Sequence, residues 1–306
     1  MLMITGAAGY LGSVVVARAL AAGHGVRAVV RDANRATAVL PHGVELAVAD
    51  LRDAAALRRA ARGCSAVLHI AGTVGGDPRV IRQTNIDGTR AVLTAAVAAG
   101  VPRLVHTSTS AAVMDATGLI AEAPAGSPAL TDPYSASKAA AEALVRAAEG
   151  IETTIVRPVA VYGPSPRGPE SYNGLIVAAA RGAVGAVVDA AVGWVLAEDA
   201  AEGHLLALEH GEPGAAYVLC GEVATFGRML DAVAARTGAP RVATLPPGAA
   251  LGPDAGTFAR RSEVYGRFPT VRVDDRGARA IGFAPRGVEE GVAVTVDWLR
   301  ARGTLP

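Results

Sequence analysis

Tyr134 and Lys138 form the residue pair whose types and spacing most directly suggest chemistry. They lie in the segment Asp132-Pro133-Tyr134-Ser135-Ala136-Ser137-Lys138, which opens a helix-forming stretch that continues from 139 to 149. An Asp followed by a Pro is typical of a helix N-cap and first helical position. Residues four apart share one face of a helix, and a nearby ammonium lowers the pKa of a phenol from its usual value of about 10. The pair is therefore suited to passing a proton.

A run of hydroxyl side chains lies at the end of the apolar stretch 104–107. This run is Thr107-Ser108-Thr109-Ser110, and the stretch before it is typical of a buried strand. The carboxyl end of a strand in a doubly wound sheet borders the ligand crevice. A hydroxyl there can donate a hydrogen bond to an oxygen that gains negative charge.

Three glycines at three-residue intervals lie between a short apolar run and a helical segment. Gly6 permits a tight turn, Gly9 lets the backbone approach a pyrophosphate, and Gly12 lets the helix pack closely on its strand. The positive end of the helix then faces the anion. Because this turn begins a β-α-β run, it predicts a dinucleotide-binding site.

The end of the second expected strand bears on which dinucleotide binds. An acidic residue there hydrogen-bonds the ribose of NAD, whereas an Arg accommodates the 2′-phosphate of NADP. The run 26–30 leads into Arg31, with Asp32 next and Arg35 four positions after Arg31. We therefore expect NADP(H) to be the preferred cofactor. NAD(H) is the alternative, if Asp32 contacts the ribose and both arginines are solvated.

These groups require a fold that gathers strand ends at one edge. Short apolar runs alternate with Ala-rich helical segments in the first half of the chain, which indicates a parallel sheet covered on both faces. Gly23, Gly63 and Gly100 fall where helices commonly end. The expected strands are 26–30, 44–48, 66–70, 104–107 and 154–157, and the expected helices are 10–23, 53–63, 89–100 and 132–149.

After residue 157 this alternation stops, and stretches rich in Gly, Pro and Ser follow. We predict an α/β fold: a Rossmann-type doubly wound parallel sheet with a smaller C-terminal α+β region that binds substrate. The predicted loops are 161–174, 238–256 and 283–287; the predicted nucleotide-binding domain is 1–160 with about 194–212, and the predicted substrate-binding region is 161–193 with 213–306.

Composition excludes several classes of protein. Of the 306 residues, 51% are hydrophobic and 19% charged, which provides ample core and excludes disorder. The 29 Lys and Arg nearly balance 28 Asp and Glu, so nothing suggests a nucleic-acid partner. Two isolated cysteines and six histidines outside ligand spacings predict no metal site and favour a reducing cytoplasm. No segment is typical of a signal peptide or membrane span, so we expect a cytoplasmic protein without a membrane partner.

Four motifs together make the chain resemble the extended short-chain dehydrogenases/reductases of the NAD(P)-dependent epimerase/dehydratase superfamily. The resemblance covers essentially the whole chain. The run 26–32 (VRAVVRD) is similar to the dihydroflavonol-4-reductase-like branch, which uses NADPH. The motifs are the TGxxGxxG turn at Thr5–Gly12, NxxGT at Asn85–Thr89, YxxxK at Tyr134 and Lys138, and RPxxVYGP at Arg157–Pro164.

The resemblance implies that the protein reduces a ketone or aldehyde by hydride transfer. It assigns Tyr134 as the general acid, and Lys138 as the group that lowers the tyrosine pKa and holds the nicotinamide ribose. Thr109 would donate a hydrogen bond to the developing alkoxide, with Ser110 as the alternative hydroxyl. The expected cofactor contacts are Gly6, Ala8, Gly9, Tyr10, Leu11, Arg31, Arg35, Asp50, Leu51, Ile70, Ala71, Gly72, Asn85, Thr107, Ser108, Tyr134, Lys138, Pro158, Val159 and Val161.

Residues that sugar-nucleotide epimerases and dehydratases usually carry are missing at three places. Ala160, Val192-Gly193 and Ser110-Ala111 stand where those enzymes have an Asn, an Arg-Asp pair and an Asp-Glu pair. We therefore expect a small, largely uncharged carbonyl or alcohol substrate, such as a secondary metabolite. An epimerase, dehydratase or isomerase that uses the nicotinamide transiently is the alternative, with Arg167 then able to hold a diphosphate.

The expected substrate contacts follow from the same resemblance. Tyr172 suits core packing equally well, and so does Trp194, a further candidate. The resemblance also favours a homodimer in which 89–100 and 134–149 form a four-helix interface, although their alanines suit packing within a monomer too. The expected substrate contacts are Thr73, Ser110, Met114, Tyr172 and Asn173.

Overall fold

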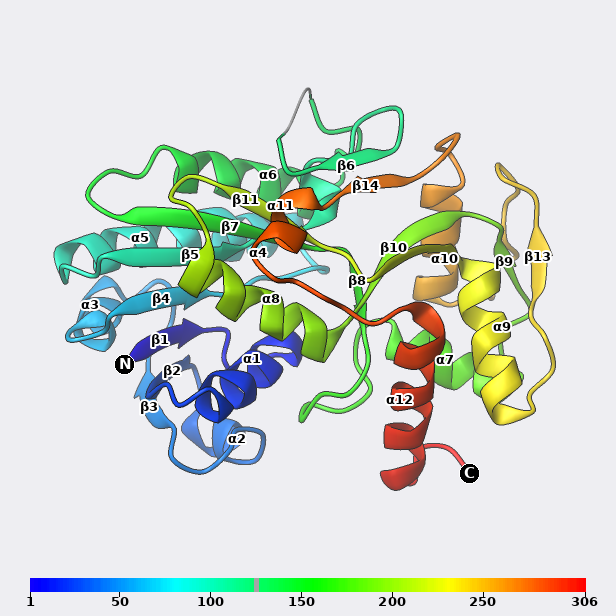
Figure 1. Ribbon diagram of the computed structural model, residues 1–306, viewed down its shortest axis with the longest axis horizontal. Helices are drawn as coiled ribbons and strands as arrows, with labels where there is room; N and C mark the ends of the chain where they lie inside the picture. The colour runs from blue at the N-terminus through cyan, green and yellow to red at the C-terminus, as the bar shows by residue number, and fades with distance from the viewer. Residues whose placement is uncertain (124–126) are drawn as a thin grey trace.

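Seven parallel strands form the central sheet, in the order β11-β7-β5-β4-β1-β2-β3 (Figure 1). The computed structural model describes residues 1–123 and 127–306. The strand order reverses at β1, because β2 and β3 extend to one side of it and β4, β5 and β7 to the other. This arrangement confirms the predicted doubly wound sheet. The strands are β1 Leu2–Thr5, β2 Val26–Val30, β3 Glu45–Val48, β4 Ala66–His69, β5 Arg103–Thr107, β7 Glu152–Pro158 and β11 Ala216–Leu219.

Helices cover both faces of this sheet, as Figure 1 shows. Along β1, Leu2 and Ile4 belong to the core shared with α1 and α8, whereas Met3 belongs to the core shared with α3, α5 and α6. Side chains alternate along a strand, so a strand that is apolar on both sides must be covered on both sides. The helices are α1 Tyr10–Ala21, α3 Ala54–Ala61, α5 Gly88–Ala98, α6 Pro133–Arg146 and α8 Ala197–His210.

The ends of these helices follow local sequence signals. Asp53 caps α3 by accepting a hydrogen bond from the backbone N–H of Ala56, at 2.9 Å. Asp132 caps α6 in the same way, with Pro133 at the first helical position, as the sequence predicts. The predicted helix-ending glycines 23, 63 and 100 all adopt the left-handed conformation, with φ of 85°, 72° and 70°.

The rest of the chain builds smaller sheets and helices at one side of the central sheet (Figure 1). β8 and β12 flank β10, β13 pairs with β9, and β14 pairs with β6. An aromatic cluster holds this region together, with the rings of Tyr172 and Phe226 centred 5.1 and 5.2 Å from that of Trp194. These elements are β6 Leu119–Ala121, β8 Ala160–Tyr162, α7 Asn173–Ala180, β9 Ala186–Val188, β10 Ala191–Leu196, β12 Glu222–Thr225, α9 Phe226–Thr237, β13 Ala243–Leu245, α10 Thr257–Tyr265, β14 Arg272–Asp274 and α12 Val288–Ala301.

The structure places two stretches of the chain in sheets other than those that the predicted domain boundaries imply. The prediction assigned all of 213–306 to the substrate-binding region, but β11 pairs with β7 and forms the edge of the central sheet. The stretch 194–212 was expected to return to that sheet. Its helix α8 packs beside α1, whereas residues 194–196 belong to β10 and pair with β8 and β12. A short strand carries no local signal for the sheet it joins, so pairing partners are decided by packing.

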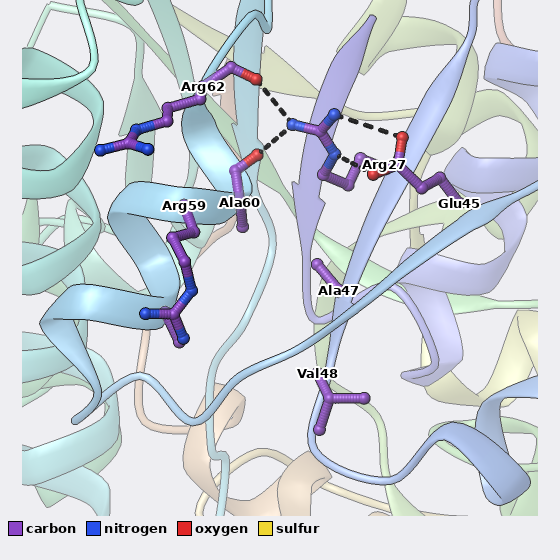
Figure 2. A pocket seen from close by; sticks show the side chains of 8 residues that line it. Arg27, Glu45, Ala47, Val48, Arg59, Ala60 and Arg62 are labelled. Atoms are coloured by element: carbon purple, nitrogen blue, oxygen red, sulfur yellow. Dashed lines mark hydrogen bonds and ion pairs between the residues drawn. The ribbon is translucent and has the colours of Figure 1, made fainter.

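Arg27 is one of the residues that line a small, open hollow beside strands β2 and β3 of the central sheet (Figure 2). Its guanidinium pairs with Glu45 on β3, with Nε 2.6 Å from Oε1, and donates to the carbonyl oxygens of Ala60 and Arg62, both at 2.7 Å. These carbonyls lie at the end of α3, where an arginine is a favourable cap. Hydrogen bonds from Arg27, on β2, therefore connect this strand to β3 and to the end of α3.

The remaining short elements connect these layers. Among the described residues, no helix is both long enough and apolar enough to cross a membrane. The connecting elements are α2 Ala33–Thr37, α4 Pro78–Arg82, a π-helical turn Gln83–Asp87, a 3-10 turn Ser110–Ala112 and α11 Arg276–Ala280.

Candidate active site

A cleft of about 1070 Å³ lies along the carboxyl ends of the central strands, where the strand order reverses. Ligand pockets usually measure roughly 300–1,000 Å³, so this cleft has room for a dinucleotide together with a small substrate. Of the predicted site residues, those that line it are Gly6, Ala8, Gly9, Tyr10, Leu11, Arg31, Arg35, Asp50, Leu51, Ile70, Ala71, Gly72, Thr73, Thr107, Ser108, Thr109, Ser110, Tyr134, Lys138, Pro158, Val159, Val161 and Tyr172.

The turn after β1 has the shape that a bound pyrophosphate requires. Gly6 has a φ of +68°, and a Cβ atom on it would lie only 2.6 Å from the backbone nitrogen of Ala71. A Cβ atom on Gly12 would lie 2.0 Å from the carbonyl oxygen of Gly6. Because only glycine fits these positions, α1 approaches closely and directs its positive end into the cleft. The turn therefore fits a dinucleotide.

Two arginines remain available at the far end of the cleft. Asp32 caps α2, accepting a hydrogen bond from the backbone N–H of Arg35 at 3.1 Å. Asp50 accepts from Nε of Arg52 at 2.7 Å, and this hydrogen bond lowers the pKa of its carboxyl group. Within 1–123 and 127–306, no carboxylate pairs with Arg31 or Arg35. Asp32 and Asp50 are thus both engaged in hydrogen bonds, while Arg31 and Arg35 are exposed.

Lys138 is held in place by the end of β5. Its Nζ donates to the carbonyl oxygen of Thr107 at 2.5 Å, and burial lowers the pKa of this amine to about 8. The Thr107 hydroxyl lies 2.8 Å from Nε2 of His204, whose Nδ1 lies 2.6 Å from the carbonyl oxygen of Ala200. Because a carbonyl only accepts, Nδ1 carries the proton and Nε2 accepts from Thr107. The helix α8 therefore fixes the strand end that holds Lys138.

The phenol of Tyr134 lies near Thr109 at the same end of the cleft. Burial raises the pKa of Tyr134, while a hydrogen bond with the Thr109 side chain and the charge of Arg261 act to lower it. The resemblance implied that Lys138 lowers this pKa. In the structure the Lys138 ammonium is directed to the Thr107 carbonyl instead, and it is not among the groups that shift the Tyr134 pKa.

Asn85 does not line the cleft, in contrast to its expected role as a cofactor contact. Its side chain is fully buried and accepts from the backbone N–H of Thr73 at 2.8 Å while donating to the Thr73 carbonyl at 3.0 Å. It also donates to Ser137 Oγ at 2.9 Å, and Ser137 donates to the carbonyl oxygen of Tyr134 at 2.7 Å. Asn85 therefore ties the wall at Thr73 to the helix that carries Tyr134.

Two predicted substrate contacts also lie outside the lining. Met114 is completely buried in the core. The Asn173 side chain makes two hydrogen bonds to the backbone of Gly163. Its Oδ1 accepts from the Gly163 N–H at 2.8 Å, and its Nδ2 donates to the Gly163 carbonyl oxygen at 2.8 Å. Tyr10 donates to the same carbonyl oxygen at 2.9 Å. Asn173 thus uses its amide to hold the loop after β8 against α1.

Three lining residues on α10 were not identified from the sequence. Phe258, Arg261 and Tyr265 are spaced three and four residues apart, so they share one face of the helix, and that face lines the cleft. The only sequence signal is an Arg-Arg pair next to aromatic residues. Trp194, by contrast, is 1% exposed and donates from Nε1 to the carbonyl of Ala224, so it belongs to the core.

Comparison with known proteins identifies the family. The model of the NAD dependent epimerase/dehydratase family matches residues 2–220. The chain belongs to this family. It is 33% identical to sterol demethylase protein B of Methylococcus capsulatus over 99% of both chains, and 28% identical to a putative dihydroflavonol 4-reductase of Synechocystis over 98% of this chain and 94% of that one. The structure of a DesIV double mutant (dTDP-glucose 4,6-dehydratase) from Streptomyces venezuelae, with NAD and DAU bound, is also similar. It has a TM-score of 0.80 at 26% identity, and the match covers 100% of this chain and 98% of that one.

Membership makes the protein an NAD(P)-dependent oxidoreductase of the extended short-chain dehydrogenase/reductase type, acting on a small molecule. The glycine turn at Gly6 and Gly12 has the close approach that the family's cofactor needs. The cofactor supplies or accepts the hydride in this family's chemistry. The chain itself places a phenol, a buried amine and a set of hydroxyls from the end of β5 in the lining of the cleft.

Proposed function

We propose that the protein is an NADPH-dependent reductase of a ketone or aldehyde group. The observation that carries this proposal is the convergence of Thr109, Tyr134 and Lys138 at one end of a cleft whose other end is suited to a dinucleotide. Tyr134 gives its proton to the carbonyl oxygen, and Thr109 donates a hydrogen bond to the same oxygen as it becomes negative. The Thr109 side chain acts to lower the pKa of the Tyr134 phenol, which favours Thr109 over Ser110 as the catalytic hydroxyl.

Lys138 has two roles in this proposal. Its ammonium lies beside Gly72, where an added Cβ atom would be 4.0 Å from Nζ, so it faces the part of the cleft that would hold the nicotinamide ribose. With an ordinary pKa of 10.5 lowered to about 8, the amine can also exchange a proton within the cleft near neutral pH.

We propose NADP(H) as the cofactor in preference to NAD(H). Exposed Arg31 and Arg35 support this, because a guanidinium binds a phosphate by two parallel hydrogen bonds. The engagement of Asp32 as the cap of α2 supports it further, since that carboxylate is then not free to bind a ribose.

The test begins with the stripped protein, NADPH and a panel of hydrophobic ketones and aldehydes. We expect turnover, and we expect Tyr134→Phe to lower kcat by roughly 10²–10⁴-fold while NADPH binding stays within about twofold. Stoichiometric NAD⁺ retained through purification, together with conversion of a nucleotide sugar, would instead establish the transient-hydride alternative. Loss of NADPH binding in Tyr134→Phe would show a structural role for the phenol.

Two further features belong to the proposal. The chain forms a homodimer through α5 and α6, where exposed alanines such as Ala98, Ala136 and Ala140 allow close approach of helices. Cys64 and Cys220 are both buried and free, which suits a reducing compartment such as the cytoplasm.

A further inference from the structure

Arg261 stands at the substrate end of the cleft, on a helix that is fixed in position. The hydroxyl of Ser262 accepts from the backbone N–H of Val188 at 2.9 Å and donates to the carbonyl of Ala259 at 2.6 Å. This anchors α10 to β9, with Ala259, Ser262 and Tyr265 buried. The face of α10 that carries Phe258, Arg261 and Tyr265 is therefore held over the cleft rather than free to turn outward.

The guanidinium of Arg261 has no ion-pair partner within the described part of the chain. Among residues 1–123 and 127–306, no carboxylate and no carbonyl oxygen hydrogen-bonds with it. Two other arginines that line the cleft are neutralised: Arg167 pairs with Glu170 at 2.8 Å, and Arg52 pairs with Asp50 at 2.7 Å. Arg261 thus differs from them in being partly buried and in lacking an ion-pair partner among the described residues.

The surroundings of Arg261 are aromatic and include the reacting end of the cleft. Tyr172 and Phe258 have their ring centres 4.8 Å apart, and Tyr265 completes this wall. Arg261 lines the same cleft as Tyr134 and Tyr172, and its charge acts against the rise that burial causes in the pKa of both phenols. A cation that is partly removed from water costs free energy unless an anion or a set of acceptors replaces the water.

We propose that the substrate carries a carboxylate, and that Arg261 binds it while Tyr134 addresses a carbonyl a few bonds away. This rests on the proposed function and changes one part of the sequence-based expectation: the body of the substrate is apolar, but one end is anionic. The planar guanidinium matches a carboxylate with two parallel hydrogen bonds. The aromatic wall of Tyr172 and Phe258 then packs against the apolar body.

The experiment compares each of a set of phenyl-substituted 4-oxo, 5-oxo and 6-oxo acids with its methyl ester, using NADPH. We expect wild-type protein to favour at least one acid over its ester by 10-fold or more in kcat/KM. In Arg261→Leu we expect KM for that acid to rise roughly 10–100-fold, and kcat/KM to fall at least 10-fold more for the acid than for the ester. Arg261→Lys should retain part of the preference. Arg267→Gln, which removes an exposed charge just after α10, should leave it intact.

Calorimetric titration of the same acids and esters into protein saturated with NADP⁺ separates this inference from the proposed function. Acid binding that depends on Arg261 without any turnover would uphold the carboxylate site and overturn the reductase. Ester turnover with no tighter binding of any acid, or equal losses for acid and ester in Arg261→Leu, would overturn the carboxylate site alone. Tight binding of the phosphate monoester of a matching keto alcohol, with no binding of the acids, would also overturn it.

Discussion

Single side chains set the protonation behaviour of this cleft. Lys138 is buried, and its pKa of about 8 lies below the 10.5 of a free lysine. The unfolded chain therefore binds more protons at this site between those two values than the folded chain does. By linkage, the contribution of Lys138 to the free energy of unfolding rises as pH increases from about 8 to about 10.5, and is constant and unfavourable below pH 8.

The variant Lys138→Met tests this pH dependence of the free energy of unfolding. Relative to the variant, wild-type protein should gain stability with increasing pH, by up to about 1.4 kcal/mol per pH unit between pH 8 and 10.5. Urea unfolding at pH 7, 8, 9 and 10 gives the free energy of unfolding of both proteins. In the difference between the two, the contributions of groups that titrate alike in both proteins cancel. A difference that stays flat across this range would mean that Lys138 keeps its ordinary pKa in the fold.

Cofactor preference is also decided by single residues. Arg31→Ala should raise KM for NADPH about 10-fold or more, because a charge-assisted contact with phosphate is removed, and should leave KM for NADH nearly unchanged. Arg58→Ala is the control, since Arg58 lies exposed on α3 and outside the cleft. Steady-state kinetics with both cofactors checks this. Equal effects on NADPH and NADH would argue against a 2′-phosphate contact.

At the scale of elements, a buried ion pair joins α6 to β7. Arg157 is 0% exposed and donates from Nε and NH2 to the carboxylate of Glu142, at 2.9 and 2.7 Å. Its NH1 also donates to the carbonyls of Ala121 and Glu122, at 2.9 and 3.0 Å. Glu142 lies one helical turn after Lys138 and acts to raise the Lys138 pKa. Arg157 thus positions α6, the helix that carries Tyr134 and Lys138, without itself lining the cleft.

Removing one partner of this pair should be more damaging than removing both. Arg157→Met leaves the buried Glu142 carboxylate with only the distant Arg146, at 4.0 Å, as its ion-pair partner, so we expect a loss of about 3–5 kcal/mol in the free energy of unfolding. Adding Glu142→Leu to that variant should recover a large part of the loss. Urea unfolding of the single and double variants measures both. A double variant as unstable as the single one would show that the backbone contacts of Arg157 dominate.

At the scale of the whole molecule, the proposed dimer makes a prediction about surface residues. Val97 on α5 is 40% exposed and belongs to the proposed interface, so Val97→Glu should convert a dimer to a monomer in light scattering. Val48, on the edge strand β3, is 60% exposed and lies beside the hollow of Figure 2. Val48→Glu should therefore leave the dimer intact. Wild-type protein with the mass of one chain would refute the dimer directly.

Much of the fold and part of the site could be predicted because they depend on neighbours along the chain. The positive φ of Gly6, the cap of α6 at Asp132 and the shared face of Tyr134 and Lys138 all arise within a few residues. Alternating strands and helices then bring strand ends to one edge of a parallel sheet. The sequence by itself therefore determined the Rossmann-type sheet, the glycine turn and the residues at the ends of its strands.

Only the tertiary structure decided which side chains from distant segments face the cleft. Met114 and Asn173 follow strands that end at the cleft. Packing nevertheless places Met114 in the core, and the Asn173 side chain hydrogen-bonds the Gly163 backbone. Arg261 reaches the cleft because Ser262 anchors α10 to β9, a contact that no local pattern encodes. The physical reason is that local sequence restricts backbone angles and periodicity, whereas the direction of a side chain in a distant element depends on which surfaces pack together.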